Sequence, residues 1–109
     1  MREIKAMIRT DRLSAVLRAL HAMPGLPGVT ASTIRGFGRR YPPEGPEPTY
    51  DEVAMTKIEL VVPAADADAV VAVIERAAHT GHGGDGKIFV IAVEQAVKIR
   101  TGERDVGAL

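Results

Sequence analysis

The chain has 109 residues, which is enough for one domain with a modest hydrophobic core but not for two domains. Its 14 basic residues balance its 14 acidic residues, so bulk electrostatic attraction to nucleic acid or to a membrane surface is not expected. The absence of cysteine excludes disulfides, cysteine-bound zinc and thiol catalysis. We find no signal peptide and no apolar run close to the ~20 residues that span a bilayer, so we expect a cytoplasmic protein without direct membrane insertion.

The first third of the sequence predicts a strand, a helix and a second strand. Ile4, Ala6 and Ile8 alternate with polar residues, as in a half-buried strand. From Asp11, which is expected to cap a helix, the apolar spacing changes to a helical stripe that ends at the Pro- and Gly-rich residues 24–28. Residues 29–37 are rich in Thr, Val and Ile and are expected to form the second strand.

A change of composition then separates the two halves of the chain. Residues 39–55 contain four prolines and no apolar period, which predicts a long solvated loop of the kind that is usually functional. Residues 56–62 alternate again as a third strand, and Asp66 is expected to cap a second helix. Residues 87–93 form the fourth predicted strand.

The order strand, helix, strand, strand, helix, strand predicts an α+β fold, the ferredoxin-like βαββαβ sandwich with an antiparallel sheet and both helices on one face. The fourth strand is apolar on both of its faces, and Met7, Ile34 and Val61 fall on the face opposite the predicted core. Leaving that second face in water would cost several kcal/mol at ~25 cal/mol per Å². Self-association through the sheet is therefore expected, and the alternative is that the C-terminal segment folds back over this face.

The segment 79–87 carries four glycines and ends in Lys87. Backbone N–H groups that no side chain shields can form a concave, partly positive nest for an anion. The spacing is not that of a Walker loop, because Lys87 leads into a strand and not into a helix. On the residues alone, both a plain glycine-rich turn and an anion site remain open.

Four blocks of sequence carry a resemblance to a known family. They are Gly-Phe-Gly-Arg at 36–39, Lys-Ile-Glu-Leu-Val-Val-Pro at 57–63, Thr-Gly at 80–81 with Gly-Asp-Gly-Lys-Ile-Phe-Val at 84–90, and Val-Glu-Gln-Ala-Val-Lys-Ile-Arg-Thr-Gly-Glu at 93–103. Together, in this order, they resemble the nitrogen regulatory protein P-II superfamily over essentially the whole chain. The resemblance implies a homotrimer that binds an adenine nucleotide (ATP, ADP or AMP) in clefts between subunits.

The same resemblance divides the single domain, residues 1–109, into functional parts. It implies that loop 39–55 binds a regulated protein partner, that loop 79–87 binds phosphate, and that 94–109 is a C-terminal segment. Thr30 falls where the family contacts adenine. Nucleotide-site positions are implied at Thr30, Gly36, Gly38, Arg39, Arg40, Gly84, Asp85, Gly86, Lys87, Lys98 and Arg100. Lys98 stands for a usual arginine, so the charge is kept and the forked geometry is lost.

Two departures concern a small-molecule effector. The family expects glutamine at Arg40, where it helps to hold Mg²⁺ and 2-oxoglutarate, and lysine at Met55, where it pairs with that dicarboxylate and the terminal phosphate. Both changes act against the same ligand set, so 2-oxoglutarate sensing is expected to be lost or altered, and the role of Mg²⁺ is left open. Tyr50 lies in the region of a modified tyrosine, but the surrounding context is absent.

The leading hypothesis is a non-enzymatic signalling protein that regulates a partner such as a membrane transporter or an efflux pump. The alternative is a metal-responsive trimer of the same fold, similar to the divalent-cation-tolerance proteins, with His79 and His82 as candidate ligands. Solvated loop histidines are favoured over that metal site, and Asp85 is expected to shape the glycine turn. An acylphosphatase-like enzyme needs an asparagine, and the chain has none. No catalytic residue is predicted.

Overall fold

The computed structural model describes residues 1–40, 47 and 49–109, and only the backbone at Arg40. The predicted role of the Arg40 side chain and the middle of loop 39–55 therefore lie outside the described residues. The strands and helices are β1 (Arg2–Arg9), α1 (Leu13–His21), β2 (Thr30–Arg40), β3 (Thr49–Val62), α2 (Ala67–Ala78) and β4 (Lys87–Ala92). Short 3₁₀ turns lie at Thr10–Arg12, Ala64–Asp66 and Asp105–Ala108.

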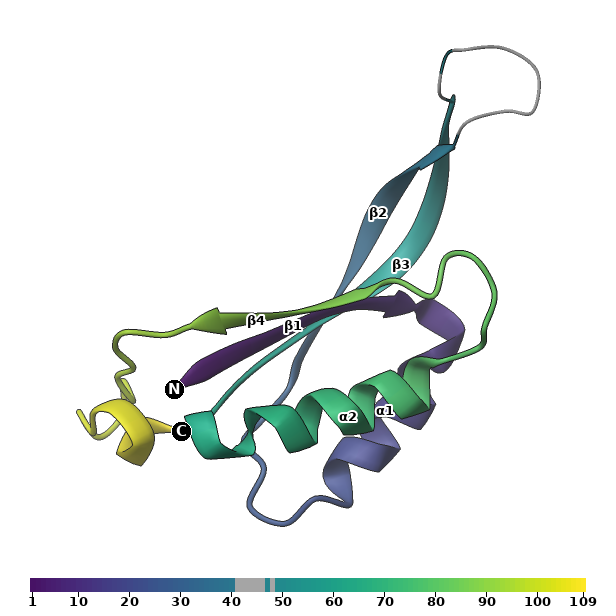
Figure 1. Cartoon of the computed structure of the whole chain (residues 1–109). Helices are drawn as coiled ribbons and strands as arrows, with labels where there is room; N and C mark the ends of the chain where they lie inside the picture. Colours follow the sequence, from purple (N-terminus) through teal and green to yellow (C-terminus); the bar gives the residue numbers. More distant parts are fainter. Residues whose placement is uncertain (41–46, 48) are drawn as a thin grey trace.

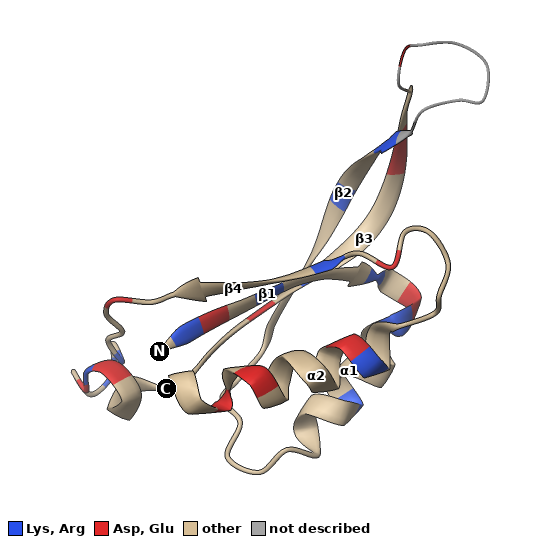
Figure 2. Ribbon diagram, in the orientation of Figure 1, with Lys and Arg blue, Asp and Glu red and all other residues tan. Residues whose placement is uncertain are grey.

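The four strands form one antiparallel sheet in the order β2-β3-β1-β4, and both helices lie against one of its faces (Figure 1). The register places Ala6 of β1 between Ile58 of β3 and Ile88 of β4. The predicted ferredoxin-like α+β fold is thereby confirmed. Acidic and basic residues are spread over the helices, the strands and the hairpin, and do not gather on one element (Figure 2). None of the helices in the described ranges is long and apolar enough to cross a bilayer.

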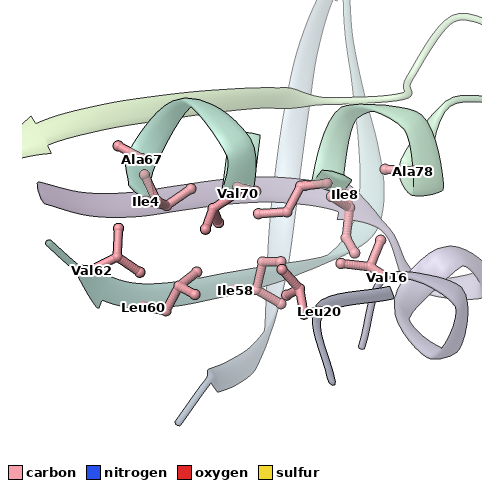
Figure 3. Close-up of a cluster of buried hydrophobic side chains, with 12 residues drawn as sticks. Ile4, Ile8, Val16, Leu20, Ile58, Leu60, Val62, Ala67, Val70 and Ala78 are labelled. Carbon is pink, nitrogen blue, oxygen red and sulfur yellow. The ribbon is translucent and has the colours of Figure 1, made fainter. Parts of the chain in front are cut away.

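The core fills the space between the sheet and the helices (Figure 3). Every second residue of β1 and of the C-terminal half of β3 is buried, because alternate side chains of a strand point to the same face. The two helices contribute the stripes that their apolar spacing predicts. The core side chains that are almost fully buried are Ile4, Ile8, Val16, Leu20, Ile58, Val62, Val70 and Ile74.

Both predicted helix caps need correction. The first helix begins at Leu13, after a 3₁₀ turn that contains Asp11, so the prediction that Asp11 caps it is wrong. Asp66 does occupy the residue before α2, but its side chain makes no capping hydrogen bond. A 3₁₀ turn leads into each helix, so Arg12 and not Asp11 holds the N-cap position of α1, and Asp66 holds that of α2 in a helical backbone conformation without a side-chain cap.

The predicted loop 39–55 contains strand at both of its ends. β2 continues to Arg40 and β3 begins at Thr49, so the predicted strand start at residue 56 is wrong by seven residues. The two extensions pair with each other in continuous register from Ile34↔Met55 to Arg40↔Thr49 and form a hairpin that projects beyond β1 (Figure 1). The four prolines that suggested a loop all lie at positions 42–48.

The sheet face away from the helices is apolar along its β4 edge and charged at its centre. Phe89 and Ile91 of β4 are 45% and 41% exposed. Their register partners on β1 are Lys5 and Glu3, whose side chains pair at 3.6 Å. This open face holds the predicted second set of apolar side chains.

Candidate functional site

A groove of about 800 Å³ lies on the open face, where the β2–β3 hairpin leaves the sheet. The root of the hairpin forms one wall and the glycine loop forms the other. The lining residues are Met7, Gly36, Phe37, Gly38, Arg39, Asp51, Val53, Met55, Gly83, Gly84, Gly86, Lys87 and Phe89. Six of the predicted nucleotide-site residues therefore meet in one groove, although the hairpin and the loop are far apart in the sequence.

Three of the loop glycines adopt a backbone geometry that favours glycine, and the first of them, Gly81, has φ of +86°. Gly84 and Gly86 both have φ of +92°, in the left-handed region that L-residues disfavour. A Cβ atom on Gly86 would also lie 1.7 Å from the carbonyl oxygen of Met7, which is shorter than any non-bonded contact. Gly86 thus allows the loop to pass directly over the end of β1 and places Lys87 at the edge of the groove.

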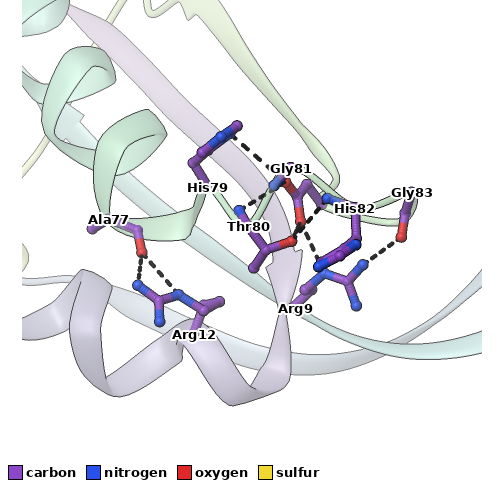
Figure 4. A network of polar contacts seen from close by, with 9 residues as sticks. Arg9, Arg12, Ala77, His79, Thr80, Gly81, His82 and Gly83 are labelled. Carbon is purple, nitrogen blue, oxygen red and sulfur yellow. Dashed lines mark hydrogen bonds and ion pairs between the residues drawn. The ribbon is translucent and has the colours of Figure 1, made fainter.

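Asp85 accepts most of the side-chain hydrogen bonds that hold this loop. Its partners Arg9, Thr80 and Gly81 lie close together (Figure 4). Its carboxylate accepts hydrogen bonds from the backbone N–H groups of Thr80 and Gly81, each at 2.9 Å, and from the Thr80 hydroxyl. These bonds, first those from Thr80, and the bond from the Arg9 guanidinium hold the pKa of Asp85 well below its usual range. The prediction that Asp85 shapes the glycine turn is confirmed, and a contact between Asp85 and a nucleotide stays a prediction.

Arg9, which ends β1, is a residue of this network that sequence reasoning missed. Its Nε donates to Asp85 Oδ1 at 2.9 Å, and its Nη2 donates to the carbonyl oxygen of Gly83. Arg12, three residues further along the chain, also donates to a distant backbone oxygen. Its Nη2 and Nε lie 2.5 and 3.0 Å from the carbonyl oxygen of Ala77, at the C-terminal end of α2. No local pattern marks either arginine, because their acceptors lie 65 to 76 residues away.

Replacing Asp85 by asparagine is expected to loosen the loop, since an amide keeps one acceptor oxygen and loses the negative charge that Arg9 faces. Because the folded-state pKa is lowered, the carboxylate stabilises the fold fully above its unfolded pKa of about 4, and this contribution is lost as pH falls below that value. Hydrogen exchange should show less protection of the Thr80 and Gly81 amides at pH 7 in Asp85→Asn. Equal protection in variant and wild type at pH 7 would contradict the role of Asp85.

The groove offers both kinds of group that bind an anion. The backbone N–H groups of Gly83 and Gly84 donate to no acceptor in the part of the chain that the structure describes. Lys87 lies beside them, exposed, and Arg39 lines the opposite wall. Across the described ranges, no three of the His, Asp and Glu side chains gather closely enough to hold a metal ion. His79 Nδ1 lies 3.9 Å from Asp85 Oδ2, a carboxylate oxygen that the loop already uses.

The chain was compared with known families and proteins. The sequence profile described as nitrogen regulatory protein P-II matches residues 1–103. The nitrogen regulatory protein P-II of Rhodospirillum rubrum is 43% identical over 115 aligned positions that cover the whole of both chains. Nitrogen regulatory protein P-II 2 of Methanothermobacter thermautotrophicus is 44% identical, covering 94% of this chain and 92% of its own. This chain belongs to the P-II family.

The solved structures agree with this assignment. The crystal structure of Arabidopsis thaliana PII bound to citrate superposes with a TM-score of 0.83 at 36% identity, covering 99% of this chain and 91% of that chain. The ferredoxin-like sheet described above is thus a P-II fold, and the family is one of signal-transduction regulators.

Four predicted site residues of this P-II chain are not among those that line the groove. One is Asp85, whose carboxylate holds the glycine loop. Thr30, at the start of β2, lines a separate hollow of about 390 Å³ together with Gly28, Glu59 and Leu109. Lys98 and Arg100 belong to the C-terminal segment, which follows the far end of β4 (Figure 1). There, hydrogen bonds from Lys98 N to Glu103 O at 2.9 Å and from Gly102 N to Lys98 O at 2.7 Å form a tight turn. Within one chain the predicted site residues are therefore not all in one place.

Proposed function

We propose that this P-II chain binds an adenine nucleotide in clefts between the subunits of a homotrimer and passes ligand occupancy to a partner protein through the β2–β3 hairpin. The observation that carries the proposal is the division of the predicted site. The groove holds Arg39, glycines of the loop and Lys87, whereas Thr30 lies in a separate hollow that the C-terminal residues Ala108 and Leu109 also line.

The groove and the hollow are too far apart to share one ligand within a subunit. Thr30 and Gly36 are six residues apart along β2, which corresponds to about 20 Å in an extended strand. If the C-terminal half of one copy faces the groove of the next, Lys98 and Arg100 would join Lys87 around the phosphates. Phe89 and Ile91 on β4, and Ile99, which is 97% exposed, supply apolar surface for such an interface.

Signalling would use the hairpin because it takes part in the groove. Gly36, Gly38 and Arg39 line the groove and belong to β2, which continues directly into the projecting hairpin. A ligand that contacts these residues would stabilise one conformation of the hairpin over others. The hairpin would then present a different surface to a partner protein. We propose that the partner is a membrane transporter or an efflux pump and that the regulation takes place in the cytoplasm.

The residue at position 55 of the groove supports a changed response to 2-oxoglutarate. At position 55 an apolar thioether, and not an ammonium group, lines the groove. A dicarboxylate would lose a charge-assisted contact there, which is typically worth about 1.5–3 kcal/mol. The related Arabidopsis PII was crystallised with citrate. We expect the affinity of this protein for nucleotide to change little when 2-oxoglutarate is added.

Titration calorimetry with ATP, ADP and AMP, each with and without 2-oxoglutarate and Mg²⁺, tests the binding, and light scattering tests the trimer.

Mixed trimers test the shared cleft. Lys87→Ala and Arg100→Ala chains should each bind weakly alone, but refolding them together at equal amounts should restore about a quarter of the clefts, because a restored cleft takes its loop from one variant and its C-terminal half from the other. No restoration, or a monomer in solution, would contradict the inter-subunit site.

A further inference from the structure

The side chain of Arg9 reaches the glycine loop from the end of β1 and contacts it at two points (Figure 4). Its Nε donates to Asp85 Oδ1 at 2.9 Å, and its Nη2 donates to the carbonyl oxygen of Gly83. A Cβ built on Gly84 would lie 3.5 Å from the same Nη2. The guanidinium therefore lies against residues 83–85, and its rigid fork holds two acceptors of the loop at once.

The bond to the Gly83 carbonyl also fixes the direction of an N–H group. The peptide that joins Gly83 to Gly84 is planar and trans, so its C=O and its N–H point in opposite directions. Because Arg9 holds the oxygen, the N–H of Gly84 faces away from the guanidinium. Gly83 and Gly84 line the groove, whereas Arg9 does not. This N–H therefore lies on the side of the loop that Arg9 leaves open.

The N–H groups at the start of the loop are already used within it. Those of Thr80 and Gly81 donate to Asp85, and that of His82 lies 3.2 Å from the Thr80 hydroxyl oxygen. In the part of the chain that the structure describes, the N–H groups of residues 83–84 make no such bond. An anion at the loop can therefore be met by these two groups and not by the three before them.

We propose that Arg9 is a positioning residue of the nucleotide site, which turns the N–H of Gly84 toward the groove to meet a phosphate oxygen. The inference rests on the proposed nucleotide site and deepens it. Arg9 acts through the loop and not by contact with the ligand. The loop is held in this orientation before the ligand arrives, so binding does not have to order it, and the affinity for phosphate is higher than a loose loop would allow.

Variants with lysine in place of arginine test the fork without changing the net charge. Arg9→Lys keeps a cation, but an ammonium on a flexible stem does not hold two acceptors in a fixed geometry. Arg12→Lys is the matched control, because Arg12 also donates through two nitrogens, but to Ala77 ahead of the loop. In titration calorimetry with the tightest-binding of ATP, ADP and AMP, Arg9→Lys should bind about tenfold more weakly than wild type, as if one more residue had to be ordered. Arg12→Lys should keep the wild-type affinity.

Amide NMR of the wild type tests the orientation without any variant. On titration with the same nucleotide, the N–H signal of Gly84 should shift strongly. The signals of Thr80 and Gly81, whose N–H groups are already bonded within the loop, should shift less. In the ligand-free protein, Arg9→Lys should also move the carbonyl carbon signal of Gly83, because the hydrogen bond to that oxygen is altered.

Wild-type affinity in a folded Arg9→Lys protein would overturn the inference, and so would an equal loss of affinity in Arg12→Lys. A Gly84 signal that stays in place while nucleotide binds would overturn it even if Arg9→Lys did not fold. The proposed function stands after each of these outcomes, because the protein still binds nucleotide. If wild type binds none of the three nucleotides, the proposed function fails and the inference fails with it.

Discussion

Gly86→Ala is expected to lower the free energy of unfolding by about 3 kcal/mol or more, the largest effect of any alanine substitution in the glycine loop. An alanine Cβ would lie 1.7 Å from the Met7 carbonyl oxygen, and this oxygen belongs to the backbone of a central strand that cannot move without disturbing the sheet. The φ of +92° adds its own penalty for an L-residue. Urea unfolding followed by circular dichroism measures the loss.

The neighbouring glycines supply matched controls for this prediction. A Cβ on Gly83 would meet no heavy atom within 4 Å, so Gly83→Ala should change stability by no more than about 0.5 kcal/mol. Gly84 shares the φ of +92°, but a Cβ there would meet only the end of the Arg9 side chain, at 3.5 Å. The loss of unfolding free energy in Gly84→Ala should therefore lie between those of Gly83→Ala and Gly86→Ala. Equal effects at Gly83 and Gly86 would show that the crossing over Met7 is not a tight contact in solution.

The parts of the fold that sequence patterns predict are those with one buried face. In β1 and in the second half of β3, burial of alternate residues produces the alternation of Ile4, Ile8, Ile58 and Val62 that is visible in the sequence. The stripes of both helices have the same cause. Regular burial of one face selects apolar residues at regular spacing in the sequence, and for this reason the order of strands and helices could be predicted.

The hairpin extensions could not be predicted in this way. Residues 49–54 of β3 are exposed throughout, so neither face selects for apolar side chains. Their strand structure comes from pairing with β2, an interaction between segments that local composition does not reveal. The nearby prolines, all at positions 42–48, led us to expect a loop also at residues 39, 40 and 49–55, where the structure has strand.

The candidate site was predicted in part. Glycine composition and family resemblance indicated the loop, and the structure brings it to the hairpin root as expected. Arg9 remained hidden because it is an ordinary alternating residue of β1 whose acceptors lie more than seventy positions away. Thr30, Lys98 and Arg100 do not line the groove of their own chain, and only the proposed cleft between subunits would bring them to it.

Lys87→Glu is expected to weaken adenine-nucleotide binding by about a hundredfold or more. The wild-type ammonium would lose a charge-assisted contact worth about 1.5–3 kcal/mol, and the new carboxylate would repel the phosphates as well. The side chain is exposed at the start of β4, so the fold should tolerate the change. Titration calorimetry with the tightest-binding nucleotide gives the loss, and circular dichroism checks the fold.

Arg18→Glu is the matched control, since Arg18 is exposed on α1 and the substitution makes the same change in net charge away from the groove. Its affinity for nucleotide should stay close to that of wild type. Salt separates a direct contact from a general charge effect, because ions screen the attraction between Lys87 and phosphate. Wild-type affinity should fall as salt increases, and that of Lys87→Glu should fall less. If Lys87→Glu folds and binds as tightly as Arg18→Glu, the groove beside the glycine loop does not hold the phosphates.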